Sequence, residues 1–202
     1  MKIVAHRGVW STSVPGNSLA AHLGALKKGW GTEVDVRDRD GLLVIAHDPG
    51  EKGAPLFEDL LAAAPARSLF AVNVKAAGLL PEIAGALERH GHRGFVFDLP
   101  PPEFPVARRL ALPAYGRLSP FETRLQFADA VGGVVLDSFG DAGFWRGLSS
   151  LRTEAAGKPV FVISDEIHGL DPLPQWVLLK ESAGADDALC TDRPDEAAEF
   201  FE

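Results

Sequence analysis

The chain has 202 residues, enough for one domain with a sizeable apolar core, and 46% of them are hydrophobic and 24% charged, as in ordinary globular proteins. Its 20 basic and 28 acidic side chains give a formal net charge of -8, which disfavours a general affinity for nucleic acid or anionic membranes. No apolar stretch approaches the roughly 20 residues that span a bilayer, and the single cysteine, Cys190, excludes an internal disulfide. We therefore expect a cytoplasmic protein without a nucleic-acid partner or a transmembrane segment.

Short runs typical of β-strands alternate with helical stretches along the whole chain. Several of these runs are continuously apolar, as in Val134-Val135-Leu136, which favours parallel strands that are covered by helices. The predicted strands are Lys2–Ala5, Gly31–Val36, Leu69–Val74, Gly94–Phe97, Ala114–Arg117, Gly133–Leu136, Pro159–Ile163 and Asp187–Cys190.

Helical segments are predicted between these strands. Ser119-Pro120 and Arg193-Pro194 have the form of helix starts with proline in the first turn. The sequence also allows a hairpin strand over Gly41–Ala46 and a short helix over Leu56–Ala63. The main predicted helices are Asn17–Lys28, Leu79–His90, Pro102–Leu110, Pro120–Ala128, Ala142–Ala156, Pro174–Ser182 and Pro194–Phe201.

Eight strands that alternate with helices predict an α/β protein, namely a compact single-domain (β/α)8 TIM barrel over residues 1–202. The alternative is an open doubly wound sheet. No G-x-G-x-x-G motif and no P-loop follows the first strand, which disfavours the nucleotide-binding version of that sheet. No linker or change of composition divides the chain.

Polar residues at the ends of the first two strands are the first candidates for a site, because strand C-termini build the active face of such a barrel. The first strand ends at His6-Arg7, and the second carries Glu33 and Asp35. Residues two apart on a strand share a face, so both carboxylates should point into the barrel mouth. A hard divalent cation would relieve their repulsion. The alternatives are a solvated strand end or ion pairs with Arg7 or Lys75.

Two further segments carry candidate residues. His47 precedes Asp48, and a histidine near a carboxylate can act as a general acid or base, although a lone loop histidine is more often structural. The third strand ends in Asn73-Val74-Lys75. Asn73 could ligate a cation through its amide oxygen, and Lys75 could bind a phosphate as a point charge. The alternative for Lys75 is pairing with nearby carboxylates.

Together these motifs resemble the opening of the glycerophosphodiester phosphodiesterase family, within the phosphatidylinositol-phospholipase-C-like superfamily. In that family a strand ends in His-Arg-Gly, a Pro-Glu-Asn-Thr segment starts the first helix, and a Glu-x-Asp strand and a His-Asp-Pro loop follow. The segment Cys190-Thr191-Asp192-Arg193-Pro194 resembles the last strand and turn of the family. The middle of the chain shares with the family only the alternation of strands and helices. The matching motifs, in order, are His6-Arg7-Gly8, Pro15-Gly16-Asn17-Ser18, Glu33-Val34-Asp35 and His47-Asp48-Pro49.

The resemblance implies a metal-dependent phosphodiesterase that acts on a glycerophosphodiester or a related small-molecule or lipid phosphodiester. By position it implies that His6 and His47 form the acid/base pair. It also implies that Glu33 and Asp35 bind a divalent cation, Mg²⁺ or Ca²⁺, and that Arg7 contacts the phosphate. Zinc is disfavoured because the sequence has no Cys/His cluster.

The sequence departs from the family pattern at two positions. Asn73 stands where the family usually has a Glu two residues before a Lys, so we take Asn73 as the third metal ligand and Lys75 as a second phosphate contact. Gly16 replaces the Glu of the Pro-Glu-Asn-Thr segment. Both departures bear on metal affinity and on substrate choice.

Three alternative functions remain at this point. The first is a non-catalytic barrel that keeps a phosphate pocket, which the loss of a carboxylate at Asn73 motivates. The second is a phospholipase-D-like enzyme of the spider-venom type, which is similar around the same motifs and acts on choline lipids. The third is a barrel isomerase or aldolase that uses Lys75, but it leaves the His-Arg-Gly and His-Asp-Pro placements unexplained.

Six more polar residues follow the fourth to seventh predicted strands and are candidates from the barrel prediction alone. Asp137 has the parity to point inward, and Arg117 would add positive charge near a phosphate. For each of the six, a structural role is an equal alternative. They are Asp98, Arg117, Asp137, Asp165, Glu166 and His168.

Overall fold

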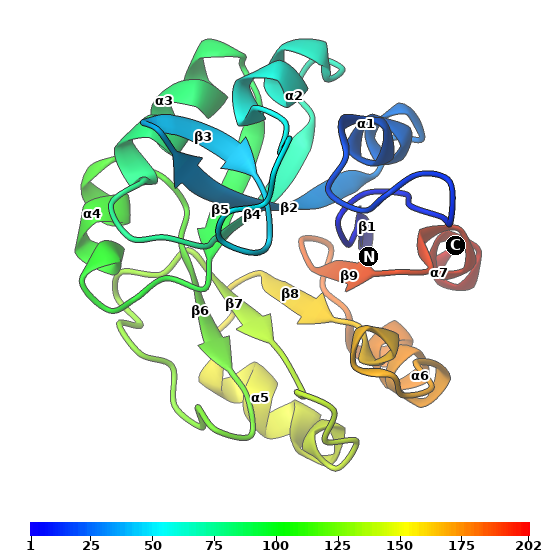
Figure 1. The fold of residues 1–202 in the computed structure, drawn as a ribbon. Helices are drawn as coiled ribbons and strands as arrows, with labels where there is room; N and C mark the ends of the chain where they lie inside the picture. The colour runs from blue at the N-terminus through cyan, green and yellow to red at the C-terminus, as the bar shows by residue number, and fades with distance from the viewer.

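The computed structural model describes residues 1–202, and its parallel strands form a ring with the helices outside it (Figure 1). A ninth strand, β3 (Leu42–Ile45), pairs antiparallel with β2 outside that ring. The ring strands are β1 (Lys2–Ala5), β2 (Gly31–Arg39), β4 (Leu69–Val74), β5 (Arg93–Phe97), β6 (Tyr115–Leu118), β7 (Gly133–Leu136), β8 (Val160–Ile163) and β9 (Ala188–Thr191).

Neighbouring strands follow the order β5-β4-β2-β1-β9-β8-β7-β6. The two ends of this sheet, β5 and β6, meet through a single bridge between Val96 and Ala114, and the amide of Val96 donates a 2.9 Å hydrogen bond to the carbonyl of Pro113. The sheet is therefore a nearly closed (β/α)8 barrel, as predicted, and the open doubly wound alternative is wrong.

Seven α-helices and two 3₁₀ turns cover the barrel. Ser18 caps the first helix, because its hydroxyl accepts a hydrogen bond from the amide of Ala21. None of the helices is long and apolar enough to cross a bilayer. The helices are α1 (Leu19–Lys27), α2 (Phe57–Ala63), α3 (Leu80–Arg89), α4 (Glu103–Arg109), α5 (Leu148–Glu154), α6 (Leu173–Ser182) and α7 (Pro194–Phe201), and the turns are η1 (Phe144–Gly147) and η2 (Asp165–His168).

The predicted helix Pro120–Ala128 is wrong, because this segment forms turns. The hydroxyl of Ser119 accepts hydrogen bonds from the amides of Phe121 and Glu122, which gives the backbone a local alternative to helical bonding. Phe127 has a φ of 53°, outside the helical region. The predicted helix Ala142–Ala156 is instead divided into η1 and α5.

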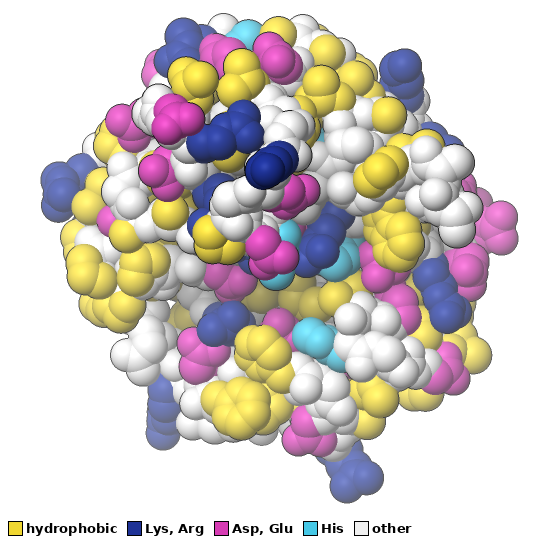
Figure 2. Space-filling view, viewed as in Figure 1, with side chains coloured by type: hydrophobic (Ala, Val, Ile, Leu, Met, Phe, Trp, Pro, Cys, Tyr) yellow, Lys and Arg dark blue, Asp and Glu magenta, His cyan; other side chains and the backbone are white.

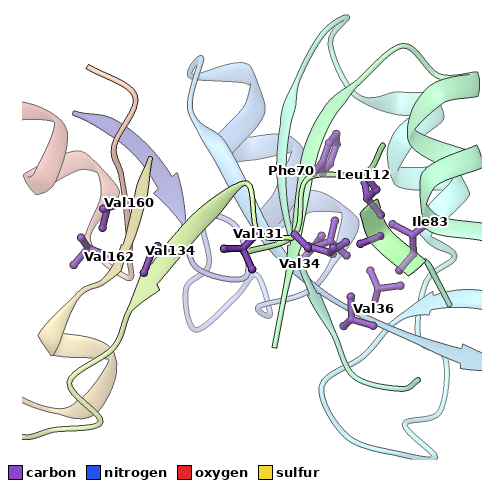
Figure 3. Close-up of a cluster of buried hydrophobic side chains, with 14 of the residues drawn as sticks. Val34, Val36, Phe70, Ile83, Leu112, Val131, Val134, Val160 and Val162 are labelled. Carbon is purple, nitrogen blue, oxygen red and sulfur yellow. The ribbon is translucent and has the colours of Figure 1, made fainter. Parts of the chain in front are cut away.

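Two apolar layers hold the barrel together. The larger one lies between the strands and the helices and contains Val34, Val36, Phe70 and Ile83 (Figure 3). The smaller layer fills the barrel interior, where Phe161 is fully buried. Val34 and Val36 lie in the outer layer, so the alternate residues of β2 face inward, as the period of two predicts. The core therefore fixes which side chains of β2 reach the barrel mouth.

Candidate active site

A cavity of about 230 Å³ opens at the C-terminal ends of the strands. Figure 2 shows this face hollowed near its centre, with histidine, acidic and basic side chains gathered around the hollow. Phe97, Val135, Ile163 and Cys190 give the cavity an apolar part. Six of the seven predicted site residues line it, and the seventh, Asp35, contacts two of them. The six are His6, Arg7, Glu33, His47, Asn73 and Lys75.

Asp35 lies below the cavity surface and is bonded by three side chains. Its Oδ1 lies 3.0 Å from Nζ of Lys75, and its Oδ2 lies 3.2 Å from Nε of Arg7 and accepts a 2.7 Å hydrogen bond from Nδ2 of Asn17. Burial by itself raises the pKa of this carboxyl, but Lys75, Asn17 and Arg7 outweigh it, so the pKa of Asp35 is lowered. The ion pairs that the sequence allowed as an alternative are thus present.

Glu33 is also buried, but it has fewer charged and hydrogen-bonding partners than Asp35. Its Oε2 accepts a 3.1 Å hydrogen bond from the amide of Arg7, and its Oε1 bonds no protein atom. Burial, with the nearby charge of Asp35, raises the pKa of Glu33 to about 7. Asn73 pairs with Asp35 across the β2–β4 ladder, and its buried Oδ1 has no hydrogen-bond partner. Glu33 and Asn73 therefore present two oxygen atoms that the protein leaves unbonded.

The loop between β1 and α1 is shaped by two residues of the matching motifs. Gly8 has a φ of 83°, and a Cβ there would lie 2.3 Å from the carbonyl carbon of Ala21, so only glycine lets the loop approach α1. Asn17 also has a positive φ of 58°, and its amide donates a 3.0 Å hydrogen bond to the carbonyl of Arg7. These contacts hold the loop so that Arg7 and Asn17 both reach Asp35.

His6 is oriented by the turn that follows β9. Its Nδ1 forms a 2.8 Å hydrogen bond with Oδ1 of Asp192, and Nε1 of Trp10 donates to the same oxygen. Glu166 holds the turn, because it accepts hydrogen bonds from the amide of Asp192 and the hydroxyl of Thr191. Burial lowers the pKa of His6, but the hydrogen bond to Asp192 and the charges of Glu33 and Asp192 prevail, so the pKa is raised.

His47 reaches the mouth through the β2–β3 hairpin. The amide of Ala46 donates a 3.0 Å hydrogen bond to the carbonyl of Asp35, and Arg37 donates to the carbonyl of His47. The hairpin therefore sets His47 beside the middle of β2, next to Asp35 and Arg37. Nδ1 of His47 forms a 2.9 Å hydrogen bond with the exposed Asp48, and the His47 side chain is 43% exposed, which leaves its ring accessible from the cavity.

Three of the six further candidates from the barrel prediction also line the cavity. Asp98 follows β5, Asp137 follows β7, and His168 ends η2. Oδ1 of Asp137 accepts a 2.9 Å hydrogen bond from the amide of Phe139 and bonds Nε2 of His168 at 2.7 Å. Asp98 is held by Arg117 at 3.0 Å.

The remaining three of those candidates do not line the cavity. Arg117 pairs with Asp98 and Glu122 and stacks on the ring of Phe139 at 5.0 Å. Asp165 is buried, where it accepts hydrogen bonds from Ser138 and Trp145. Glu166 supports the turn at Asp192, as described above. All three have supporting roles.

Two contacts in the candidate site do not follow from the sequence motifs alone. Asp192 was noted only within the final turn, although a carboxylate that follows the last strand lies next to the first strand once the barrel closes. Asn17 was noted only within its motif. His6 and Asp192 lie 186 residues apart, so only the pairing of β9 with β1 brings them together. Asn17 and Asp35 are 18 residues apart and meet where the loop before α1 packs against β2.

Comparison with known proteins finds the same fold in two glycerophosphodiester phosphodiesterase structures and in one structure of a phosphodiesterase. The enzyme from Parabacteroides distasonis has a TM-score of 0.74 at 18% identity, over 99% of this chain and 96% of that one. A phosphodiesterase from Oleispira antarctica, in complex with the product sn-glycerol-3-phosphate, has a TM-score of 0.70 at 17% identity, with the same coverage. The glycerophosphoryl diester phosphodiesterase domain of a Mycobacterium tuberculosis protein has a TM-score of 0.63 at 15% identity, over 100% and 99% of the two chains. No family model and no curated protein matches the chain by sequence.

Proposed function

We propose that this protein is a metal-dependent phosphodiesterase of the glycerophosphodiester phosphodiesterase family, acting on a glycerophosphodiester or a related phosphodiester. One observation carries the proposal: all four matching motifs converge on one barrel mouth. Two histidines, two carboxylates and the basic side chains of Arg7 and Lys75 lie there, in or against one cavity. The three similar structures named above support it, and one of them holds a phosphodiesterase product.

Arg7 and Lys75 are the residues that bind the phosphate in this proposal. The terminal nitrogens of Arg7 donate no hydrogen bond to any protein atom, and the side chain is 35% exposed, so they remain available to phosphate oxygens. Lys75 is tied to Asp35 but still lines the cavity. Charged hydrogen bonds from such groups are among the strongest available to a phosphate.

The donor set fits a hard divalent cation, Mg²⁺ or Ca²⁺. The buried Oδ1 of Asn73 has no partner, Oε1 of Glu33 has none, and all the candidate ligand atoms are oxygens. Glu33, Asp35 and Asn73 would hold the cation, although Asp35 must share its oxygens with Lys75 and Arg7. No three His, Cys, Asp or Glu side chains gather as a metal site, which agrees with the loss of the third carboxylate at Asn73. When bound, the cation would polarise a phosphoryl oxygen and offset negative charge in the transition state.

His6 and His47 provide the acid and the base. One of them takes the proton from the nucleophile, and the other gives a proton to the leaving alkoxide. Asp192 supports this role for His6, because its hydrogen bond to Nδ1 fixes the ring and leaves Nε2 for the substrate. The nucleophile is water or a neighbouring hydroxyl of the substrate, and the latter gives a cyclic phosphate.

The test is a panel of phosphodiesters assayed with Mg²⁺, Ca²⁺, Mn²⁺ or EDTA, with release of the alcohol and of phosphomonoester or cyclic phosphate measured separately. We expect turnover that EDTA abolishes and that one of the cations restores. The double variant His6→Ala/His47→Ala is the matched control for contaminating activity. Turnover that is equal in this control would contradict the proposal.

A second candidate is a non-catalytic phosphate-binding barrel, and Asn73 is the observation that favours it. Its signature would be binding of a phosphodiester by calorimetry with no turnover under any metal condition. Retention of both histidines and both carboxylates at the cavity supports the enzyme instead.

A further inference from the structure

The outward face of α6 is apolar, although it is exposed to solvent. The helix buries Trp176 and Leu179 against the barrel, and a surface helix ordinarily turns polar side chains outward. On the outward side of α6, however, Leu173, Val177 and Leu178 are 51%, 46% and 40% exposed. Three large apolar side chains gathered on one helix indicate an interaction surface, whereas single exposed apolar residues are ordinary.

A groove of about 510 Å³ extends this apolar face towards the preceding helix. The turn η1 and helix α5 form one wall of the groove and α6 forms the other, on the outside of the barrel (Figure 1). Leu148 lines the first wall, and Pro174 and Leu178 line the second. This groove, together with Leu173 and Val177, is the α5–α6 surface. It is separate from the 230 Å³ cavity of the candidate active site, because the two share no lining residue.

The polar groups at the base of the groove are already bonded within the protein. Asp165 accepts hydrogen bonds from Ser138 and Trp145. Oε1 of Gln175 accepts a 3.1 Å hydrogen bond from the amide of Asp165, and its Nε2 donates a 2.9 Å hydrogen bond to the carbonyl of Ile163. These groups offer little to a polar small molecule, so the surface suits an apolar partner.

Two charged side chains of the groove form no ion pair within the chain. Arg146 lies on the η1 wall, and Asp171 directly precedes α6, where it accepts a 3.1 Å hydrogen bond from the amide of Leu173. The surface thus carries one unpaired charge of each sign, in a chain whose net charge is -8. Such a surface has no excess of positive charge to attract an anionic membrane, whereas its charges are complementary to those of a second copy.

We propose that the α5–α6 surface is the interface of a homodimer with twofold symmetry. In such an interface both copies use the same surface, and each contact occurs twice. A twofold axis that passes between Arg146 and Asp171 brings Arg146 of each copy to Asp171 of the other. The same axis lays Val177 and Leu178 of each copy over the η1–α5 wall of the second. This inference is independent of the proposed phosphodiesterase activity.

Sedimentation equilibrium over a series of protein concentrations tests the interface. We expect the wild type to have the mass of two chains, and Val177→Glu and Leu178→Glu to have the mass of one. Each substitution removes an apolar contact from both copies and should raise the Kd at least about a hundredfold. Both side chains are exposed in the monomer, so circular dichroism should show that the variants fold. Arg109→Asp is the control, because it reverses an exposed charge on α4, outside the surface, and should leave the dimer intact.

Charge reversal tests the twofold arrangement. Arg146→Asp alone opposes two carboxylates at both contacts, and Asp171→Arg alone opposes two guanidinium groups, so each variant should raise the Kd by about tenfold or more. In an equimolar mixture of the two variants, both contacts of a heterodimer again pair opposite charges. We expect heterodimers with close to the wild-type Kd. Loss of the hydrogen bond from the amide of Leu173 to Asp171 would not be rescued by mixing.

Three outcomes would overturn the proposal. A wild type that stays monomeric at every concentration would leave the surface to a different partner. A dimer that Val177→Glu and Leu178→Glu both leave intact would show that another face forms the interface. Charge-reversed variants that dissociate separately and stay monomeric when mixed would exclude the pairing of Arg146 with Asp171 about a twofold axis.

Discussion

The carboxylate of Asp35 is surrounded by nitrogen donors of its own chain. Lys75 and Arg7 balance its charge, and Asn17 fixes its orientation. A cation in this site therefore has to compete with two side chains for Asp35, whereas Glu33 and Asn73 are free to bind it. Metal affinity should therefore depend chiefly on Glu33 and Asn73, and Asn73 contributes only a neutral oxygen.

The exchange of Asn73 for a carboxylate tests this dependence. Asn73 supplies a neutral oxygen, so we expect weak metal binding to the wild type alone and tighter binding when a phosphodiester analogue adds its own negative oxygen. Because such coupling is reciprocal, metal should also tighten the binding of the analogue. Asn73→Asp and Asn73→Glu should raise metal affinity without the analogue. Calorimetric titrations of all three proteins check this, and tight binding by the wild type that is unchanged in both variants would remove Asn73 from the coordination shell.

Removal of either histidine tests the acid/base assignment. We expect His6→Ala and His47→Ala each to lower kcat by roughly 10²–10⁴-fold, the usual range for a lost general acid or base. Both side chains are partly exposed at the cavity, so circular dichroism and thermal melting should match the wild type. A variant that keeps near wild-type kcat on the best substrate would show that its histidine is not a catalyst.

The candidate residues in the first 75 positions could be predicted because the motifs are local and their order survives in the sequence. His6, Glu33, His47 and Lys75 all reach the predicted mouth. The partners that orient them could not be predicted in the same way, since Asp192 meets His6 only when β9 pairs with β1. Roles for all these residues stay predictions until the variants are assayed.

At the scale of single elements, helix α1 carries a fully buried histidine against β2. Nδ1 of His22 bonds the hydroxyl of Thr32 at 2.7 Å, and Nε2 has no partner. Burial lowers the pKa of His22 from its ordinary 6.5 to about 3, with Asp35 opposing the shift. The packing of α1 on the barrel therefore requires a neutral imidazole.

This requirement predicts how stability depends on pH. A base whose pKa is lowered by folding contributes stability above about pH 6.5, and this contribution is lost as the pH falls from 6.5 towards 3, with a slope of at most about 1.4 kcal/mol per pH unit. Urea unfolding of the wild type and His22→Gln between about pH 7.5 and 4 checks it, because other groups cancel in the difference. The wild type should lose stability relative to the variant as the pH falls. A constant difference would mean that His22 is not buried as a neutral group.

The bounds of a strand or helix could be predicted where a continuous apolar run or a proline in the first turn marks them. Strands β1, β4 and β7 and helix α7 have their predicted bounds, because continuous apolar runs and a first-turn proline leave little choice. The same proline signal failed at Ser119-Pro120. There the hydroxyl of Ser119 accepts a hydrogen bond from the backbone amide of Glu122, and the carboxylate of Glu122 accepts one from Arg117. Such competition between local bonds and helix formation is not visible in a pattern of apolar residues.

At the scale of the whole molecule, the barrel has one weak seam. Strands β2 and β4 pair over five register positions, whereas β5 and β6 share one isolated bridge. We expect native-state hydrogen exchange to give lower opening free energies for β6 than for β2 and β4, which are paired on both sides and serve as the internal control. Equal protection of these strands would show that helix packing, rather than strand pairing, sets the opening of the barrel.

The single cysteine gives this chain a built-in reporter of global opening. Cys190 has no exposed surface at the bottom of the cavity, and burial raises the pKa of its thiol well above the ordinary value. A thiol reagent should therefore react with it only when β9 leaves the barrel. Iodoacetamide labelling in increasing urea, read as one mass increment per chain, should follow the same transition as circular dichroism. Rapid labelling of the native protein would show that the reagent reaches the base of the cavity without unfolding. In that case a second cysteine, introduced elsewhere as a labelling site, could no longer be labelled selectively.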